Sequence, residues 1–452
     1  MRGIVISSNS SGGGKTTISL GLMKALKNRG FDVQGYKVGP DYIDTAFHSK
    51  ITGNYSRNLD LFLMGEEGVK ASFSRGKGDY AVIEGVMGLY DGKGVDSKNS
   101  TAHIARLLGL PVILVLSPKA QVATLCAEIN GIVGFESVNI VGVIFNNIGE
   151  GYFKLLKKAV EKSCKIKVFG YIPKDERLLI GSRHLGLIQS SEIYELEEKI
   201  DYCAGLIEKH INVDDLLHEF KNCKKFKDNF HIKSFDIKIA VAKDKAFSFY
   251  YKENIELLEE LGEVVYFSPL EDKKLPKDID LLYIGGGYPE IFKEELSSNK
   301  SLLMDIKKSL DNGIRCYAEC GGLMYLMSSF IEKDYGKEVG YNMVNFFKGS
   351  SYMTSRLQNF GYAKATITED NPILPKGFSI NCHEFHRSKI ESLDKKVYLV
   401  EKEMYDESKK WWSCGYTKNN TLASYAHVHF FGNIDFIKYI AKGLRGRRSN
   451  FE

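Results

Sequence analysis

The residues near the N-terminus with the clearest chemical potential lie in a run of small side chains, NSSGGGKTT at residues 9–17. Glycines let backbone N–H groups approach phosphate oxygens without a Cβ in the way. Lys15 would reach the terminal phosphates of a nucleotide, and the Thr16 hydroxyl would help to hold Mg²⁺. The pattern predicts an ATP-binding loop, with a flexible turn before a helix as its alternative; the loop comprises Gly12, Gly13, Gly14, Lys15, Thr16 and Thr17.

Two polar residues that end apolar runs could complete a nucleotide site. Glu84 follows YAVI, so its carboxylate would lie at the carboxyl edge of a parallel sheet and could bind the metal. Asn146 follows GVIF, and we expect it to hydrogen bond an adenine edge. The alternatives are a solvent-facing carboxylate for Glu84 and a local role in a turn for Asn146.

The stretch YKVGPDYIDTAFH at residues 36–48 gathers four ionisable side chains just past a strand. These are Lys37, Asp41, Asp44 and His48. Several such groups in one loop at the carboxyl edge of a sheet indicate contact with a metal or a substrate. A loop that only faces solvent is the alternative.

A cysteine in the second half lies where a nucleophile would be presented. In IRCYAECGGLMYLM an apolar strand ends at Glu319, Cys320 follows, and two glycines precede an apolar helix. This is the thiol form of a nucleophile elbow, in which the helix N-terminus favours the thiolate. Upstream, YIGGGYPE ends another strand in glycines that could offer N–H donors to an oxyanion. A cysteine that merely permits tight packing is the alternative.

Two histidines near the C-terminus could activate that thiol. His427 and His429 lie two apart in ASYAHVHF. Alternation along a strand would put both on one face, so periodicity does not choose between them. A Cys–His pair is a common arrangement for thiol activation.

Alternating strands and helices are expected to position all of these residues. Short runs that are nearly all apolar suit strands buried on both faces of a parallel sheet. We expect strands at 2–8, 32–39, 80–86, 111–117, 139–147, 237–244, 263–269, 279–287 and 314–319, and helices at 15–30, 101–110, 152–163, 250–262 and 300–313. The predicted organisation is α/β throughout: a P-loop-type, mostly parallel sheet domain at 1–222, a polar linker at 223–236 and a second α/β domain at 237–452.

Composition narrows the functional class. The 452 residues are 43% hydrophobic and 26% charged, which is ordinary for globular domains, and the net charge of +5 is small. The sequence has no dense basic stripe of the kind that would indicate a nucleic-acid partner, and it has no apolar run long enough for a membrane helix. The N-terminus enters a strand directly, without the pattern of a signal peptide, so we expect a cytoplasmic protein. The sequence does not decide the oligomeric state, and a homodimer is one possibility.

Taken together, the motifs resemble known families. YAECGGLMYL, GGGYPE and SYAHVHF resemble a class I glutamine amidotransferase domain, whereas SSGGGKTT, YKVGPDYIDTAFH, IEGVMGLYDG and SRHLGL resemble the ATP-binding domain of dethiobiotin synthetase-like enzymes. Both domains in this order resemble the cobyrinate a,c-diamide synthase family over essentially the whole chain. The second domain is therefore expected to be a class I glutaminase.

The resemblance implies a reaction and roles for residues. ATP would phosphorylate the a and c acetate carboxylates of cobyrinate, a tetrapyrrole, and ammonia released from glutamine would displace the phosphate. Cys320 would be the glutaminase nucleophile and His427 its base, while the acid that usually completes the triad is not evident after His427. The remaining implied roles are Mg²⁺ binding by Thr16, Asp41 and Glu84, substrate binding by Tyr42, Asp44 and His48, and oxyanion binding by Gly286, Gly287 and Gly321.

Two alternatives remain at this point. The same amidation could act on Ni-sirohydrochlorin or hydrogenobyrinate, because the sequence does not distinguish between these macrocycles. A more distant alternative is a nucleotide switch with a degenerate glutaminase domain, which would have lost its nucleophile.

Overall fold

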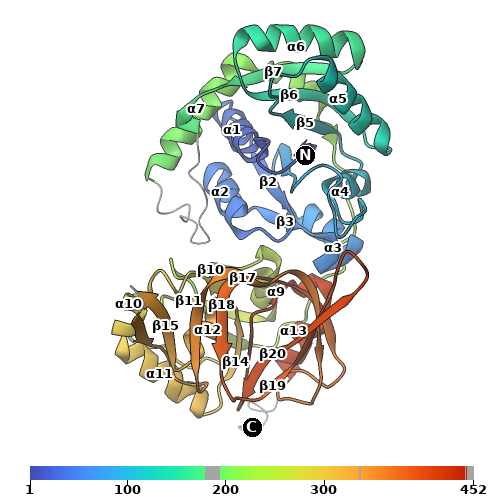
Figure 1. The fold of residues 1–452 in the computed structure, drawn as a ribbon. Coiled ribbons are helices and arrows are strands. Elements are labelled where there is room, and N and C mark those ends of the chain that lie inside the picture. The colour runs from blue at the N-terminus through green and yellow to red at the C-terminus, as the bar shows by residue number, and fades with distance from the viewer. Residues whose placement is uncertain (179–193, 335–336, 443, 445–452) are drawn as a thin grey trace. The chain divides into compact units, whose positions relative to one another are not determined.

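The computed structural model describes residues 1–178, 194–334, 337–442 and 444 (Figure 1). The chain forms two compact units: unit 1 is Met1–Leu61 with Glu66–Asn229, and unit 2 is Phe62–Gly65 with Phe230–Glu452. The division after Asn229 falls inside the segment 223–236 that the sequence predicts as a linker. The first part of that segment is nevertheless bound to unit 1, because the Cys223 N–H donates to the Met1 carbonyl and Arg75 pairs with Asp228.

Unit 1 is built on a sheet whose strands run in the order β3-β2-β4-β1-β5-β6-β7. All of these pairings are parallel, whereas the short β8 pairs with β1 in the antiparallel sense. The mostly parallel sheet predicted for the first domain is therefore confirmed. Its strands are β1 (Arg2–Ser8), β2 (Val33–Val38), β3 (Arg57–Leu59), β4 (Tyr80–Glu84), β5 (Val112–Leu116), β6 (Ile140–Ile148), β7 (Lys167–Pro173) and β8 (Lys221–Asn222).

Helices connect these strands and cover the sheet. Among the described residues they are α1 (Lys15–Asn28), α2 (Tyr42–Thr52), α3 (Leu61–Arg75), α4 (Thr101–Leu108), α5 (Ala123–Phe135), α6 (Glu150–Ser163), α7 (Tyr194–His210) and α8 (Val213–Glu219). A short 3-10 turn, η1, spans Glu176–Leu178. α3 bends at Gly65, where φ is 66°.

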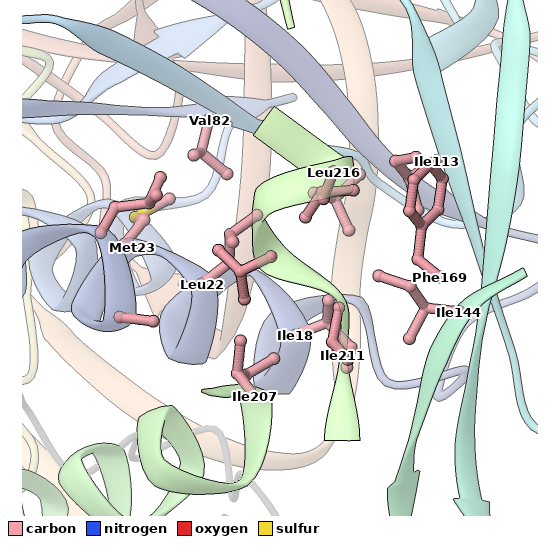
Figure 2. Close-up of a cluster of buried hydrophobic side chains, with 14 of the residues drawn as sticks. Ile18, Leu22, Met23, Val82, Ile113, Ile144, Phe169, Ile207, Ile211 and Leu216 are labelled. Carbon is pink, nitrogen blue, oxygen red and sulfur yellow. The ribbon is translucent and has the colours of Figure 1, made fainter. Parts of the chain in front are cut away.

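The main hydrophobic core of unit 1 lies between the sheet and α1, α7 and α8 (Figure 2). Ile18 and Leu22 of α1 are buried there against Ile144 of β6 and Ile207 of α7. Residues 18 and 22 share a helix face because they are four apart. This packing fixes the start of α1 at the carboxyl end of β1, where the glycine-rich loop lies.

The secondary structure predicted from the sequence is wrong for one segment of unit 1. Residues 41–48 were expected to form a loop, whereas α2 begins at Tyr42. The Asp41 side chain caps the helix by accepting hydrogen bonds from the N–H groups of Ile43 and Asp44, at 2.8 and 2.9 Å. Asp44 and His48 therefore lie one turn apart on a single helix face, which a loop would not have ensured.

Unit 2 joins a parallel and an antiparallel region in one sheet of order β11-β9-β12-β14-β21-β20-β19-β17-β15-β16. The α/β prediction for this domain is confirmed by its parallel region, which consists of β9 (Ile237–Ala242), β11 (Gly262–Phe267), β12 (Leu281–Ile284), β14 (Arg315–Glu319) and β21 (Thr421–Ser424). The first four strands were expected from the sequence, whereas β21 was not. Its helices are α9 (Lys252–Leu261), α10 (Lys293–Ser298), α11 (Lys300–Asp311), α12 (Gly321–Leu326) and α13 (Asp435–Lys442).

The antiparallel region was not anticipated from the sequence. It brings a histidine from the end of the chain beside the cysteine elbow, because β22 pairs with β18 and His427 lies opposite His383. The remaining strands are β10 (Phe247–Phe249), β13 (Gly286–Gly287), β15 (Ser329–Asp334), β16 (Lys337–Asn342), β17 (Ser350–Ile367), β18 (Ser379–Glu391), β19 (Lys396–Glu403), β20 (Lys409–Lys418) and β22 (His427–Val428), and a 3-10 turn, η2, spans Phe430–Gly432. In the described ranges, no helix has the length and apolar character needed to cross a membrane.

Candidate active sites

The glycine-rich loop of unit 1 has the backbone shape expected of a phosphate cradle. Gly12 and Gly14 adopt φ angles of 76° and 97°, in the region that favours glycine. Gly14 precedes α1, whose first turn leaves N–H groups without intrahelical acceptors. The loop can therefore turn several backbone donors and a helix N-terminus towards one anion.

Close packing behind the loop explains its middle glycines. A Cβ at Gly13 would lie 2.0 Å from Ser8 Oγ, and one at Gly14 would lie 2.2 Å from Asn146 Nδ2. Any larger residue would displace the loop. Asn146 itself donates a hydrogen bond to Ser117 Oγ at 3.2 Å, so its amide packs against the loop and is held by the residue that follows β5.

A cavity of 640 Å³ opens above the loop within unit 1. It is large enough for a nucleotide and a reacting group. Eight residues predicted to bind ATP, metal or substrate line it: Gly12, Gly14, Lys15, Thr16, Thr17, Asp41, Asp44 and Asn146. Lys37, Ser117, Lys119 and Asn147 also contribute to its wall.

A buried network of charges supports the floor of this cavity. Glu84 is fully buried and accepts hydrogen bonds from Thr16 Oγ1 at 2.5 Å and from Lys37 Nζ at 2.8 Å. Lys37 also pairs with Asp44 at 2.7 Å, and His48 Nε2 lies 2.8 Å from the second Glu84 oxygen. The sheet edge therefore places one cation among two carboxylates, next to the hydroxyl of the loop.

The network fixes the charge of its members. Burial opposes ionisation of Glu84, but Lys37 and His48 outweigh it and hold the pKa of Glu84 well below its usual range. Burial would lower the pKa of Lys37, yet Asp44 and Glu84 keep that pKa far above its usual value. Lys15 differs, because burial and the neighbouring Lys37 lower its pKa to about 8.

The structure places two of the predicted substrate residues away from the cavity. His48 is fully buried and bonded to Ser56 and Glu84, so it cannot contact a substrate and instead orients the carboxylate. Tyr42, on the first turn of α2, is half-buried and does not line the cavity. Glu84 lies beneath the cavity wall and reaches it through Thr16. The SRHLGL string at 182–187 lies outside the described residues.

The cysteine of unit 2 occupies a strained elbow. Cys320 lies between β14 and α12 with φ 49° and ψ −101°, a conformation that costs a non-glycine residue about 1–3 kcal/mol. Its N–H donates to the Ser424 carbonyl at 2.7 Å, which fixes the turn to β21. A Cβ at Gly322 would lie 2.2 Å from the Ile284 carbonyl, so the helix can begin this close to β12 only with glycine there.

The glycines predicted to bind an oxyanion surround this elbow. A Cβ at Gly321 would lie 3.2 Å from the backbone nitrogen of Gly287, so these two residues face each other beside Cys320. Gly286 has a further role, because a Cβ there would lie 2.5 Å from Cε1 of His427. The missing side chain of Gly286 makes room for the imidazole.

His427 is buried beside the thiol. It is hydrogen bonded to Cys320, and its Nδ1 lies 3.6 Å from Oε2 of Glu319. Burial alone would lower the pKa of His427, but the Cys320 thiolate and the Glu319 carboxylate raise it to about 10. The site therefore favours a protonated His427 imidazole beside the Cys320 side chain.

His429 has different neighbours. Its Nδ1 accepts a hydrogen bond from the Phe431 N–H at 3.2 Å, and its Nε2 lies 3.4 Å from Glu253. The strand ends at Val428, and His429 already caps the following 3-10 turn. These contacts join His429 to Glu253 and to the turn that follows, not to the Cys320 elbow.

Sequence reasoning missed Glu319 as a partner of His427. It identified Glu319 only as the last residue of the strand before Cys320, and it found no acid after His427. The contact depends on which strands are neighbours in the sheet, and the sequence does not show this. β14 and β21 are parallel neighbours, and the segment after β21 returns past the carboxyl end of β14.

Two family models match the chain. Residues 4–187 match the CobQ/CobB/MinD/ParA nucleotide binding domain, and residues 238–434 match the CobB/CobQ-like glutamine amidotransferase domain. The first matched region holds the glycine-rich loop and the second holds Cys320 and His427.

Relatives match nearly the full length. A cobyrinate a,c-diamide synthase of Clostridium tetani (strain Massachusetts / E88) is 65% identical, covering 97% of this chain and 99% of its own. One of Clostridium acetobutylicum is 63% identical, covering 98% and 100%. A solved structure of the septum site-determining protein MinD with Mg-ADP from Pyrococcus horikoshii OT3 is 19% identical over 48% of this chain and 97% of its own, with a TM-score of 0.31.

Proposed function

The chain belongs to the cobyrinate a,c-diamide synthase family, and from that premise we propose that it amidates the a and c acetate carboxylates of cobyrinate with ATP and glutamine. The observation that carries this proposal is the presence of two different sites on one chain. Unit 1 has a cavity lined by a phosphate-binding loop and carboxylates, and unit 2 has a cysteine elbow with a buried histidine.

In unit 1 the proposed step is activation of a carboxylate. A substrate carboxylate oxygen attacks the γ-phosphorus of ATP, the bond to the bridging oxygen breaks, and ADP and an acyl phosphate result. Backbone N–H groups of the loop and the ammonium of Lys15 would stabilise the charge on the phosphoryl oxygens. Ammonia then attacks the acyl carbon, and the bond between that carbon and the phosphate oxygen breaks. The products are the amide and inorganic phosphate.

The residues of this cavity fit Mg²⁺. Hydroxyl and carboxylate oxygens, which this ion prefers, are contributed to one wall by Thr16, Asp41 and Asp44. Thr16 and Asp41 would hold the ion, with Glu84 adding negative charge behind the Thr16 hydroxyl. When bound, Mg²⁺ supplies positive charge to the phosphate oxygens.

In unit 2 the proposed step is release of ammonia from glutamine. The Cys320 thiolate attacks the side-chain amide carbon, and the oxygen that becomes negative would be met by N–H groups of Gly287 and Gly321. The C–N bond breaks as His427 gives its proton to the leaving nitrogen. Water then attacks the thioester, returns a proton to His427 and releases glutamate.

The test is mass spectrometry of the macrocycle after incubation with the full chain, ATP, Mg²⁺ and glutamine. Cobyrinate, hydrogenobyrinate and Ni-sirohydrochlorin are compared as substrates. We expect cobyrinate to be converted to a product that carries two amides. Amidation of another macrocycle alone would overturn the substrate assignment, and nucleotide binding with no amidation and no glutamate release would indicate a nucleotide switch.

A further inference from the structure

Glu319 is a buried carboxylate at the centre of unit 2 that the proposed steps above leave without a role. It ends β14, directly before Cys320, and only 1% of it is exposed. The Tyr317 hydroxyl donates to its Oε1 at 2.8 Å, and the Tyr283 hydroxyl donates to its Oε2 at 3.3 Å. The backbone N–H of Val428 donates to Oε1 at 3.3 Å.

These donors hold the carboxylate in place without neutralising it. Burial and the neighbouring Glu319 raise the pKa of Tyr317 and of Tyr283 well above their usual range, so both hydroxyls stay neutral donors. Within the described residues, the ion-pair contact of Glu319 is the one with His427. A buried negative charge is costly unless a cation pairs with it, and a protonated His427 is the cation within reach.

The geometry points to Glu319 as the residue that positions His427 for catalysis, a proposal that rests on the glutaminase activity proposed above. Its carboxylate faces Nδ1 of the imidazole at 3.6 Å, which leaves the opposite ring nitrogen, Nε2, to face the Cys320 thiol. The distance is slightly long for a hydrogen bond, as is common for catalytic contacts before substrate binds. The residue before the nucleophile thus supplies the acid that the segment after the base lacks.

A purely architectural role for Glu319 makes different predictions. The contact with the Val428 N–H could simply fasten β22 to β14. Removing a contact with that role would lower the stability of the fold and disturb the whole site. Removing a charge that stabilises the imidazolium would instead change the protonation of the Cys–His pair while the fold persists.

The experiment compares Glu319→Gln with Glu253→Gln in the full chain. Both replacements keep side-chain size and remove one buried carboxylate near a histidine, and Glu253 lies beside His429, 3.4 Å from its Nε2. Three quantities are measured: glutamate release, ammonia-dependent amidation, and the rate of Cys320 alkylation by iodoacetamide as a function of pH. Thermal unfolding shows whether each variant is folded.

For Glu319→Gln we expect kcat for glutamate release to fall about 10- to 100-fold, the range typical of residues that orient a reactive ligand, with KM for glutamine little changed. Ammonia-dependent amidation should persist. The pH profile of alkylation should move to higher pH, because a less stabilised imidazolium leaves less thiolate at neutral pH. Glu253→Gln should leave that profile where it is in the parent.

Two outcomes would overturn the proposal. One is a folded Glu319→Gln variant with the parent's kcat and alkylation profile. The other is equal loss in Glu319→Gln and Glu319→Asp, because the aspartate keeps the charge and should retain more activity if charge matters. Alkylation needs no glutamine, so an unmoved profile counts against Glu319, whereas a parent that releases no glutamate counts against the proposed glutaminase activity.

Discussion

The two units use the same local device, a parallel strand that turns sharply into a helix, for different purposes. In unit 1 the turn from β1 to α1 takes six residues, Asn9–Gly14, and opens onto a cavity of 640 Å³. In unit 2 the turn from β14 to α12 is a single strained residue, Cys320, which is only 7% exposed. A long glycine-rich turn presents many backbone donors to a ligand, whereas a one-residue turn presents one side chain.

Charge is arranged differently around the two turns. The loop of unit 1 lies above an internal ion-pair network in which Lys37 contacts both Asp44 and Glu84, while Lys15 lines the cavity beside it. In unit 2 His427 lies beside both Cys320 and Glu319, which raise the pKa of the imidazole to about 10. The first site therefore directs Lys15 and backbone donors towards an external anion, whereas the second directs its cation, His427, towards its own nucleophile.

The sharpest way to separate the two regions is Cys320→Ala. Because the thiolate serves only to release ammonia, we expect glutamine-dependent amidation to vanish and amidation with added ammonium to persist. Both rates are measured on one preparation. Full glutamine-dependent activity in the variant would show that Cys320 is structural.

The histidines test the second region from within. We expect His427→Ala to lose glutamate release almost as completely as Cys320→Ala, since it removes the group bonded to the thiol. His429→Ala should keep a measurable part of the activity, because its contacts are with Glu253 and Phe431. Glutamate release is measured side by side, and a dead His429 variant with a mild His427 variant would mean that the base is misassigned.

Removing Lys15 tests the first region. Lys15→Ala should lower ATP-dependent amidation about 10²- to 10³-fold even when ammonium is supplied, because a charge that stabilises phosphoryl transfer is lost. Glutamate release should be less affected. Lys24→Ala is the matched control, since Lys24 lies on the same helix in a partly exposed pair with Asp201. Near-normal ammonium-dependent amidation in Lys15→Ala would place the phosphate site elsewhere.

The smallest expected effect is on the pH dependence of ATP binding. The pKa of Lys15 is lowered to about 8, and bound phosphate should raise it again. Affinity should therefore be constant below about pH 8 and fall by up to about tenfold for each pH unit above it, with proton uptake on binding. Calorimetry in buffers of different ionisation enthalpy measures both quantities. An affinity that stays constant through about pH 10, equal to that of Lys15→Ala, would contradict this assignment.

The sequence was sufficient to predict structure where a segment's conformation depends on residues that are close along the chain. The glycine run, the apolar strands and the Cys-Gly-Gly turn each depend on neighbouring residues, and the structure has elements at all of these positions. It was insufficient where partners are distant along the chain. The burial of His48 depends on α2 packing over β2 and β4, and the approach of Glu319 to His427 depends on the antiparallel region that closes unit 2.

The most direct test of the account follows oxygen atoms during amidation. Cobyrinate whose acetate carboxylates carry a heavy oxygen isotope is incubated with the full chain, ATP, Mg²⁺ and glutamine, and the inorganic phosphate released is analysed by mass spectrometry. If ATP activates the carboxylate as an acyl phosphate, one labelled oxygen should move to phosphate for each amide formed. Amide formation with unlabelled phosphate would contradict the proposed chemistry of unit 1.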